Sequence, residues 1–157
     1  MKVILMSVGK TDDTNFTQII DTYKNRLKFY ISFDLDFIPD LKKTKNLSQK
    51  EQKNLEGKNI LSRIQSNDYL VLLDDKGKQY TSVTFAQFIE KKTHIISKRI
   101  IFLIGGPYGF SDEVYNRANE KISLSKMTFT HQMVRLVFIE QLYRAMTILN
   151  NEPYHHE

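Results

Sequence analysis

The sequence predicts an α/β fold, a mostly parallel sheet flanked by helices. Residues 2–8, 69–73 and 100–104 are nearly continuous apolar runs of strand length, a composition typical of strands covered on both faces. Segments with helical spacing of apolar residues separate these runs, so strands and helices alternate along the chain. The 157 residues contain no repeat, linker or shift in composition. We therefore expect a single domain over residues 1–157.

The first half of the chain contains one further strand and two helices. Residues 33–38 alternate apolar and acidic side chains, which predicts a strand in an exposed or edge position. Residues 16–27 carry an apolar helical stripe, and a polar side chain at positions 12–14 can cap its start. Residues 48–64 predict a mostly solvated helix after a lysine-rich loop at residues 42–45. The apolar stripe of that helix consists of Leu55, Ile60, Leu61 and Ile64.

The second half continues the alternation. A third helix is expected to begin near Ser82, and a fourth at Ser111, whose hydroxyl can cap it. A short fifth strand follows at residues 122–125, and a loop at residues 126–130 precedes a last helix that begins with His131. The core side of the third helix is predicted to contain Phe85, Phe88, Ile89 and Ile95.

The last helix is apolar on nearly every side. Its apolar residues extend over positions 133–149 and leave no wide polar face. Such a helix lies either at the centre of its own domain or in a contact between subunits. A chain of this size cannot easily cover all sides of its terminal helix, so the sequence favours a subunit interface and a homodimer.

Composition excludes several classes of protein. The chain has no Cys, which rules out disulfide frameworks, thiol nucleophiles and Cys-ligated metal centres. No apolar run approaches the ~18 to 20 residues of a membrane span, and the start becomes polar too quickly for a signal peptide. We expect a soluble, cytoplasmic protein with no membrane partner. The formal net charge is +5, with 11 basic and 7 acidic side chains in residues 76–157, which favours a polyanionic partner only weakly.

Three loops at the ends of predicted strands are candidate ligand sites, because open α/β sheets bind ligands at the carboxyl ends of their strands. These loops are residues 74–78, 105–109 and 126–130. The glycine-rich middle loop lacks both the dinucleotide and the P-loop spacing, and Asp112 and Glu113 after it would repel a phosphate. The loop either binds an uncharged or cationic ligand or is simply a tight turn between a strand and a helix. The four His residues lack metal-binding spacing, so no metal site is expected.

Longer motifs connect these loops to a known family. The motifs are Leu73-Asp74 through Gly77-Lys78, Leu103-Ile104-Gly105-Gly106-Pro107-Tyr108-Gly109, Leu124-Ser125-Lys126-Met127-Thr128-Phe129-Thr130-His131-Gln132-Met133-Val134-Arg135, Glu140-Gln141-Leu142-Tyr143-Arg144-Ala145 and Pro153-Tyr154-His155. Through them, essentially the whole chain resembles the RlmH family. These are small bacterial SPOUT-class methyltransferases that modify a pseudouridine of large-subunit ribosomal RNA.

The resemblance implies a SPOUT-type fold in which a C-terminal trefoil knot holds S-adenosyl-L-methionine. It also implies an obligate homodimer. Carried over by position, the cofactor-binding residues are Leu73, Gly105, Leu124, Ser125, Lys126, Met127, Thr128 and Phe129. They lie in or beside the same three strand-end loops.

The implied reaction methylates N3 of a pseudouridine in 23S ribosomal RNA, on the assembled ribosome. N3 is an imide nitrogen that carries a proton, so the enzyme must favour loss of this proton while it aligns the nitrogen with the methyl donor. Arg135 and Arg144 are expected to hold RNA phosphates or to structure the dimer, and ion pairs with Glu140 are the alternative for both. We hypothesise that three further side chains surround the target base: His131, Tyr154 and His155.

A catalytically inactive ribosome- or RNA-binding module with the same fold is the alternative function. The intact glycine loop and residues 124–129 argue against it, because a pure binding module needs no cofactor pocket. One departure from the family concerns the tail. Family members usually carry Arg or Lys after the Tyr-His pair, whereas this chain has His156 and Glu157.

Overall fold

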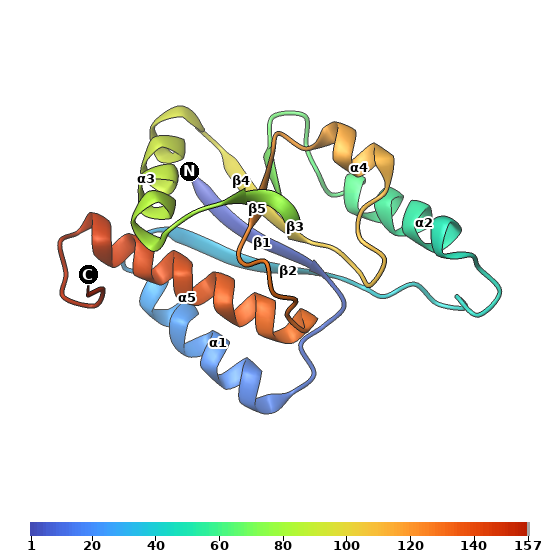
Figure 1. Cartoon of the computed structure of the whole chain (residues 1–157), viewed down its shortest axis with the longest axis horizontal. Coiled ribbons are helices and arrows are strands. Elements are labelled where there is room, and N and C mark those ends of the chain that lie inside the picture. Colours follow the sequence, from blue (N-terminus) through green and yellow to red (C-terminus); the bar gives the residue numbers. More distant parts are fainter. Residues whose placement is uncertain (157) are drawn as a thin grey trace.

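A computed structural model describes residues 1–156 and contains one five-stranded sheet with the strand order β2-β1-β4-β3-β5 (Figure 1). The elements are β1 (Lys2–Val8), α1 (Thr14–Leu27), β2 (Ser32–Ile38), α2 (Gln49–Leu61), β3 (Tyr69–Gln79), α3 (Ser82–Ile95), β4 (Arg99–Ile104), α4 (Asp112–Arg117), β5 (Glu120–Ser123) and α5 (His131–Leu149). Every paired strand is parallel to its neighbour. The predicted α/β class and the edge position of β2 are therefore confirmed.

Helices cover both faces of the sheet. Alternate residues of β1 point to opposite faces, so Val3 and Leu5 join one core cluster while Ile4 and Met6 join the other. The first cluster is covered by α1, α3 and α5, and the second by α2 and α4 (Figure 1). This burial on both sides explains why the central strands read as continuous apolar runs.

The predicted helix starts agree with the structure. Asp13 caps α1, and Ser48 and Ser111 cap α2 and α4, each accepting a hydrogen bond from a first-turn amide. The apolar side of α3 differs at its end, where Ile95 is 66% exposed and Ile96 is buried. The helix ends at Ile95, and the extended backbone of Ile96 turns the next side chain inward.

The predicted apolar stripe of α2 is wrong in part. Ile60 is buried, but Leu55 is exposed, and the helix instead buries Glu56 and Gly57. A Cβ atom on Gly57 would lie 2.3 Å from the Ser111 hydroxyl, so the absent side chain is what lets α2 approach α4 closely. A hydropathy pattern cannot predict the contact between Gly57 and Ser111, because neither residue has a large apolar side chain.

Strand β3 is longer than predicted. It pairs with β5 through Leu73 and then again through Lys78 and Gln79, with a shift in register between the two stretches. A Cβ atom on Gly77 would lie 2.6 Å from the backbone of Ile122. The backbones of the two strands are therefore in close contact at this irregularity of the pairing.

Helix α5 is covered on one side by its own chain. Phe138 packs against Phe102 of β4 with ring centroids 4.7 Å apart and against Phe85 of α3 at 6.3 Å. On the other side Met133 is exposed and Val137 is half-buried. One face of α5 is therefore part of the core of its own domain. For the other face, the subunit interface stays a prediction.

The ion pair between Asp68 and Arg99 should make stability fall at low pH. Asp68 is buried and accepts from the Arg99 Nε at 2.7 Å and from the Gln65 amide at 2.7 Å. Burial raises the pKa of Asp68, but these hydrogen bonds and the Arg99 charge outweigh it, so the pKa lies below its ordinary value. The stabilisation is present above the unfolded pKa of about 3.9 and is lost as the pH falls through the lower folded value.

D68N should cost about 2 kcal/mol at neutral pH and should flatten the decline in stability below about pH 4. Urea unfolding at a series of pH values measures both effects. The matched control is D34N, because Asp34 pairs with Lys2 while both side chains are more than 40% exposed. The control should change stability by less than about 0.5 kcal/mol, and an equal effect of both variants would contradict the assignment.

Candidate functional site

A cavity of about 780 Å³ opens at the carboxyl edge of the sheet. Its walls come from the ends of β1 and β4, from residues 73–76 within β3, from the loop after β4 and from the segment between β5 and α5. All strands are parallel, so these ends meet at one edge although they are far apart in the sequence. The predicted cofactor residues that line the cavity are Leu73, Gly105, Leu124, Ser125, Met127, Thr128 and Phe129. Lys126 belongs to the same segment but is exposed and does not line it.

The glycine loop after β4 forms one wall and leaves no room for side chains at two positions. A Cβ atom on Gly105 would lie 2.9 Å from the Phe110 ring, and one on Gly106 would lie 2.5 Å from the Glu56 carboxylate. Gly109 adopts a φ of +79°, which L residues rarely adopt. The loop is therefore a built wall of the cavity as well as a tight turn.

Glu56 of α2 binds the backbone of the glycine loop. Its carboxylate is buried and accepts a hydrogen bond from the Gly106 amide at 3.0 Å. Burial raises the pKa of Glu56, the Gly106 amide opposes this rise, and the nearby Asp40 charge adds to it. Sequence reasoning missed Glu56 because the helix reads as solvated. The only available signal was a Glu-Gly pair, which carries no hydropathy pattern.

The cavity is lined by more acidic than basic side chains. The carboxylates are Asp12, Asp40, Asp74 and Asp75, and the ammonium groups are Lys10 and Lys76. Burial raises the pKa of Asp74, but hydrogen bonds from Tyr115 and from the Lys76 amide bring it below its ordinary value. Burial and the hydrogen bond to Asp74 raise the pKa of Tyr115 to about 12. At neutral pH the site therefore presents carboxylates, and it favours a cationic ligand over a phosphate.

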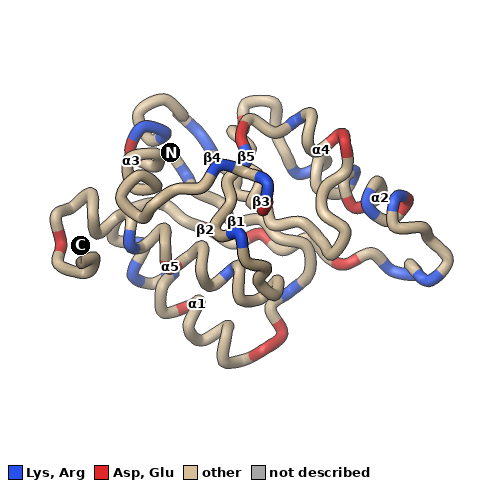
Figure 2. The backbone as a smooth tube through the Cα atoms, viewed as in Figure 1, with Lys and Arg blue, Asp and Glu red and all other residues tan. Residues whose placement is uncertain are grey.

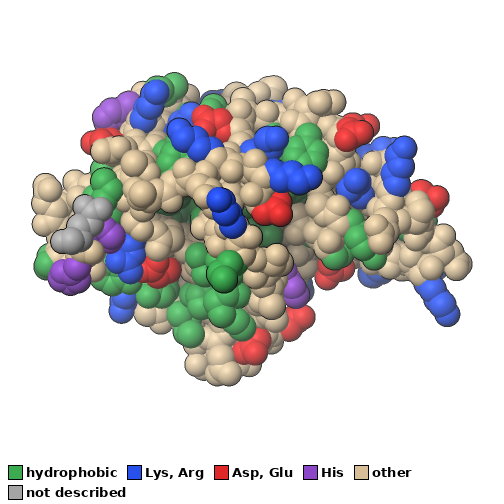
Figure 3. Space-filling model, in the orientation of Figure 1, with side chains coloured by type: hydrophobic (Ala, Val, Ile, Leu, Met, Phe, Trp, Pro, Cys, Tyr) green, Lys and Arg blue, Asp and Glu red, His purple; other side chains and the backbone are tan. Residues whose placement is uncertain are grey.

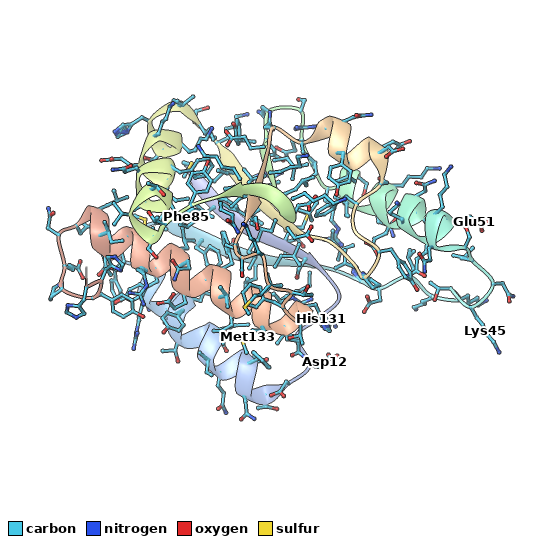
Figure 4. The ribbon with its side chains drawn as sticks, viewed as in Figure 1. Asp12, Lys45, Glu51, Phe85, His131 and Met133 are labelled. Carbon is cyan, nitrogen blue, oxygen red and sulfur yellow. The ribbon has the colours of Figure 1, made fainter. Side chains whose placement is uncertain are left out.

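His131 lies at the cavity, where α5 begins. It lines the cavity with Val134, and Figure 4 shows it near Asp12 of the loop after β1. Thr130 caps the helix by accepting from the Met133 amide at 3.2 Å, which fixes the start of α5 at this edge. His131 is thus the one predicted catalytic residue that the described chain places directly at the cavity.

The structure places Arg135 inside its own chain, which differs from the predicted contact with RNA phosphates. It is fully buried, and its Nη2 donates to the backbone carbonyls of Val8 and Gly9 at 2.9 and 2.8 Å. Its Nη1 donates to the Thr11 hydroxyl at 2.8 Å. The alternative ion pair with Glu140 is not among its contacts within residues 1–156 either. Arg135 instead fastens α5 to the end of β1, and Val8 and Gly9 line the cavity.

Tyr154 and His155 lie at the opposite end of α5. The 19 residues of this helix span about 28 Å, so the tail does not reach the cavity of its own chain. The Tyr154 ring packs on Tyr143 at 4.8 Å, and its hydroxyl donates to Glu140 at 3.1 Å. Burial, Tyr23 and Glu140 raise the pKa of Tyr154 far above its ordinary value, so the phenol stays protonated.

Arg144 connects the tail to α5. It pairs with Glu140 four residues earlier, which confirms the ion pair that the sequence offered as an alternative. Its Nη1 also lies 3.3 Å from Nδ1 of His155. A guanidinium only donates, so Nδ1 of His155 accepts this hydrogen bond. The predicted difference from the family at the end of the tail involves Glu157, which lies outside the described residues.

Comparisons with known proteins agree on one family. A family model described as "Predicted SPOUT methyltransferase" matches residues 1–155. A "Ribosomal RNA large subunit methyltransferase H" of Parabacteroides distasonis is 61% identical over the whole of both chains. Proteins of the same name from Christiangramia forsetii and Phocaeicola vulgatus are 58% and 57% identical over 99% and 100% of both chains. The chain that forms this glycine-walled, acid-lined cavity therefore belongs to the SPOUT methyltransferase family.

Proposed function

We propose that this protein uses S-adenosyl-L-methionine to methylate N3 of a pseudouridine in 23S ribosomal RNA on the ribosome. The observation that carries the proposal is the cavity, which gathers seven of the eight predicted cofactor residues together with His131. The relatives that match the full length are named as large-subunit ribosomal RNA methyltransferases. A ribosomal substrate also accounts for the proposed cytoplasmic location.

The chemistry of the cavity suits the proposed methyl donor. S-adenosyl-L-methionine is a sulfonium cation with an adenine ring, no phosphate, and a methyl group that it supplies to a nucleophile. Leu73 and Phe129 offer apolar surface to such a ring, and the glycine loop offers a close approach to backbone groups. The carboxylates that line the cavity favour the positive charge of the sulfonium. The volume of about 780 Å³ falls within the ~300 to 1,000 Å³ of small-molecule sites.

The chain itself must handle the proton of the target nitrogen. His131 at the cavity carries an imidazole nitrogen that can accept the N3 proton, whereas Nδ1 of His155 already accepts from Arg144. Tyr154 keeps its proton and donates a hydrogen bond to Glu140, so it is not the group that removes the N3 proton and can contribute to the site through its ring. Position of the base against the cavity then decides the rate, because alignment contributes more than acid strength.

A second copy of the chain would bring the two parts of the site together. Ile19 of α1 is 44% exposed and Met133 of α5 is 38% exposed, and Figure 3 shows an apolar patch over these two helices. Two copies that pair antiparallel through this patch place the tail of one protomer beside the cavity of the other. The homodimer thereby explains how His131 and His155 can surround one base although one helix separates them.

The remaining features of the proposal concern the fold. We extend it to one SPOUT domain over residues 1–157 with the trefoil knot of the family. The support for the knot is the family match over residues 1–155.

Two measurements test the proposed activity against the inactive alternative. Isothermal titration with S-adenosyl-L-methionine should show stoichiometric binding, and its absence would leave only the RNA-binding module. Mass mapping of 23S RNA from ribosomes incubated with protein and donor should show one added methyl group at a pseudouridine. Binding without any methylated nucleotide would contradict the enzyme and retain the binding module.

The hydrogen bond between Glu56 and Gly106 should matter for cofactor affinity. E56A leaves the partly buried Gly106 amide without its acceptor and frees the loop, so affinity for S-adenosyl-L-methionine should fall about tenfold. E56Q retains an acceptor oxygen and should recover most of the affinity. E51A removes an exposed carboxylate from the same helix and should change nothing. Equal affinities for E56A and E51A would contradict the role of Glu56.

A further inference from the structure

A lysine arm extends from the body of the molecule at residues 39–61. It consists of the loop after β2 and helix α2, and Figure 1 shows it reaching away from the sheet. Its lysines are Lys42, Lys43, Lys45, Lys50, Lys53 and Lys58. The same segment contains three acidic residues, of which Asp40 and Glu56 are turned to the cavity and its glycine loop. Glu51 is therefore the one carboxylate among the outward-facing charges of the arm.

Within residues 1–156 the ammonium groups of these lysines have no ionic partner. No ion pair or hydrogen bond of a lysine ammonium group in the arm occurs within residues 1–156, and all of them except Lys53 are exposed. Figure 2 shows the basic positions along the loop and α2, and Figure 4 shows Lys45 pointing outward from the far end. A local excess of unpaired positive charge repels itself, so it is suited to neutralisation by a polyanion.

The arm begins at the same edge as the cavity. The strands are parallel, so the loop after β2 leaves the sheet on the side where the loops after β1 and β4 line the cavity. Asp40 of this loop lines the cavity, and Glu56 of α2 binds the glycine loop. A nucleic acid with one base in the cavity would therefore pass its backbone beside the arm.

The residue types identify the contact as one to phosphates. Lys offers a mobile point charge that accepts phosphates in many orientations, and the arm contains no Arg for bidentate recognition. It contains no aromatic residue either, so it has no platform on which bases could stack. These properties favour sequence-independent contact with the backbone, and sequence is then read only at the cavity.

We infer that the lysine arm, residues 39–61, is a docking surface for the phosphate backbone of the substrate RNA. The inference rests on the proposed function for the identity of the RNA. An acidic surface of a ribosomal protein is the competing occupant. The two occupants differ in their salt dependence, because each phosphate contact releases a condensed counterion.

The test compares two double variants with equal changes in charge. K43E/K45E alters the far end of the arm, and K91E/K98E alters exposed lysines near the opposite, amino-terminal edge of the sheet. Sedimentation with ribosomes at graded salt measures affinity, and titration with S-adenosyl-L-methionine checks the cavity. Circular dichroism confirms that both variants fold.

The arm variant should bind ribosomes about tenfold more weakly at moderate salt, with unchanged affinity for the methyl donor. The slope of log affinity against log salt should fall in magnitude by about 1.4 to 1.8 for two lost contacts. The control should stay within about twofold of the wild type. Equal behaviour of the two variants would overturn the inference, and weaker binding with an unchanged slope would assign the arm to a protein partner instead.

The binding measurement separates this inference from the proposed function. A wild-type protein that binds ribosomes but methylates no nucleotide would overturn the proposed enzyme. The arm would still be supported in that case if K43E/K45E lowered the salt slope. Methylation that persists with equal ribosome affinity in both variants would sustain the enzyme and overturn the arm.

Discussion

R135M is expected to lower the free energy of unfolding by about 3 kcal/mol, because two buried carbonyl groups lose their donor. The guanidinium of Arg135 reaches Val8, Gly9 and Thr11 from inside the core, and Met has no group that can replace these hydrogen bonds. For a chain of 157 residues this corresponds to a melting temperature lower by roughly 6 to 12 °C. Affinity for S-adenosyl-L-methionine should fall with it, since Val8 and Gly9 line the cavity.

Two further variants separate the roles of charge and geometry at this position. R135K keeps the positive charge but has a single ammonium instead of the planar fork, so it should recover less than half of the lost stability. K10M removes an exposed cation from the same cavity wall and should leave stability unchanged. If R135M had normal stability and bound only ribosomes more weakly, Arg135 would be a phosphate ligand as the sequence suggested.

The reassignment of Arg135 shows which properties of a site a sequence can predict. Arg is usually exposed, and nothing in the residues around Arg135 distinguishes a buried guanidinium from one on the surface. The carbonyls it binds belong to the end of β1, more than 120 residues away. Contacts between a side chain and backbone groups at such separation leave no periodic pattern in the sequence.

Periodic features were predicted well for the same physical reason. Burial on both faces makes β1, β3 and β4 continuously apolar, and a helix cap needs a short polar side chain at a fixed offset. The cavity was also predictable, since parallel strands gather their terminal loops at one edge. Glu56 and Gly57 were not, because their role depends on one amide and one hydroxyl of other elements.

The tail with Tyr154 and His155 does not reach the cavity of its own chain, so the predicted site requires a second protomer. Dimers that combine two different variants test this requirement. Y154A/H155A should lose about 100-fold or more in methyl transfer while it keeps its affinity for S-adenosyl-L-methionine, because the cavity is untouched. T128W introduces an indole at an exposed position of the cavity wall and should abolish binding of the methyl donor. In the proposed dimer, each variant alone should therefore be inactive.

Co-refolding the two variants in equal amounts should restore about a quarter of wild-type activity, because half of the dimers then contain one complete site. That site combines the intact cavity of one protomer with the intact tail of the other. A tail that served the cavity of its own chain would restore nothing, since each chain carries one defect. The expected recovery follows from α5, whose 19 residues hold His131 and the tail at opposite ends of a rigid helix. Normal activity of Y154A/H155A alone would remove the tail from the reaction altogether.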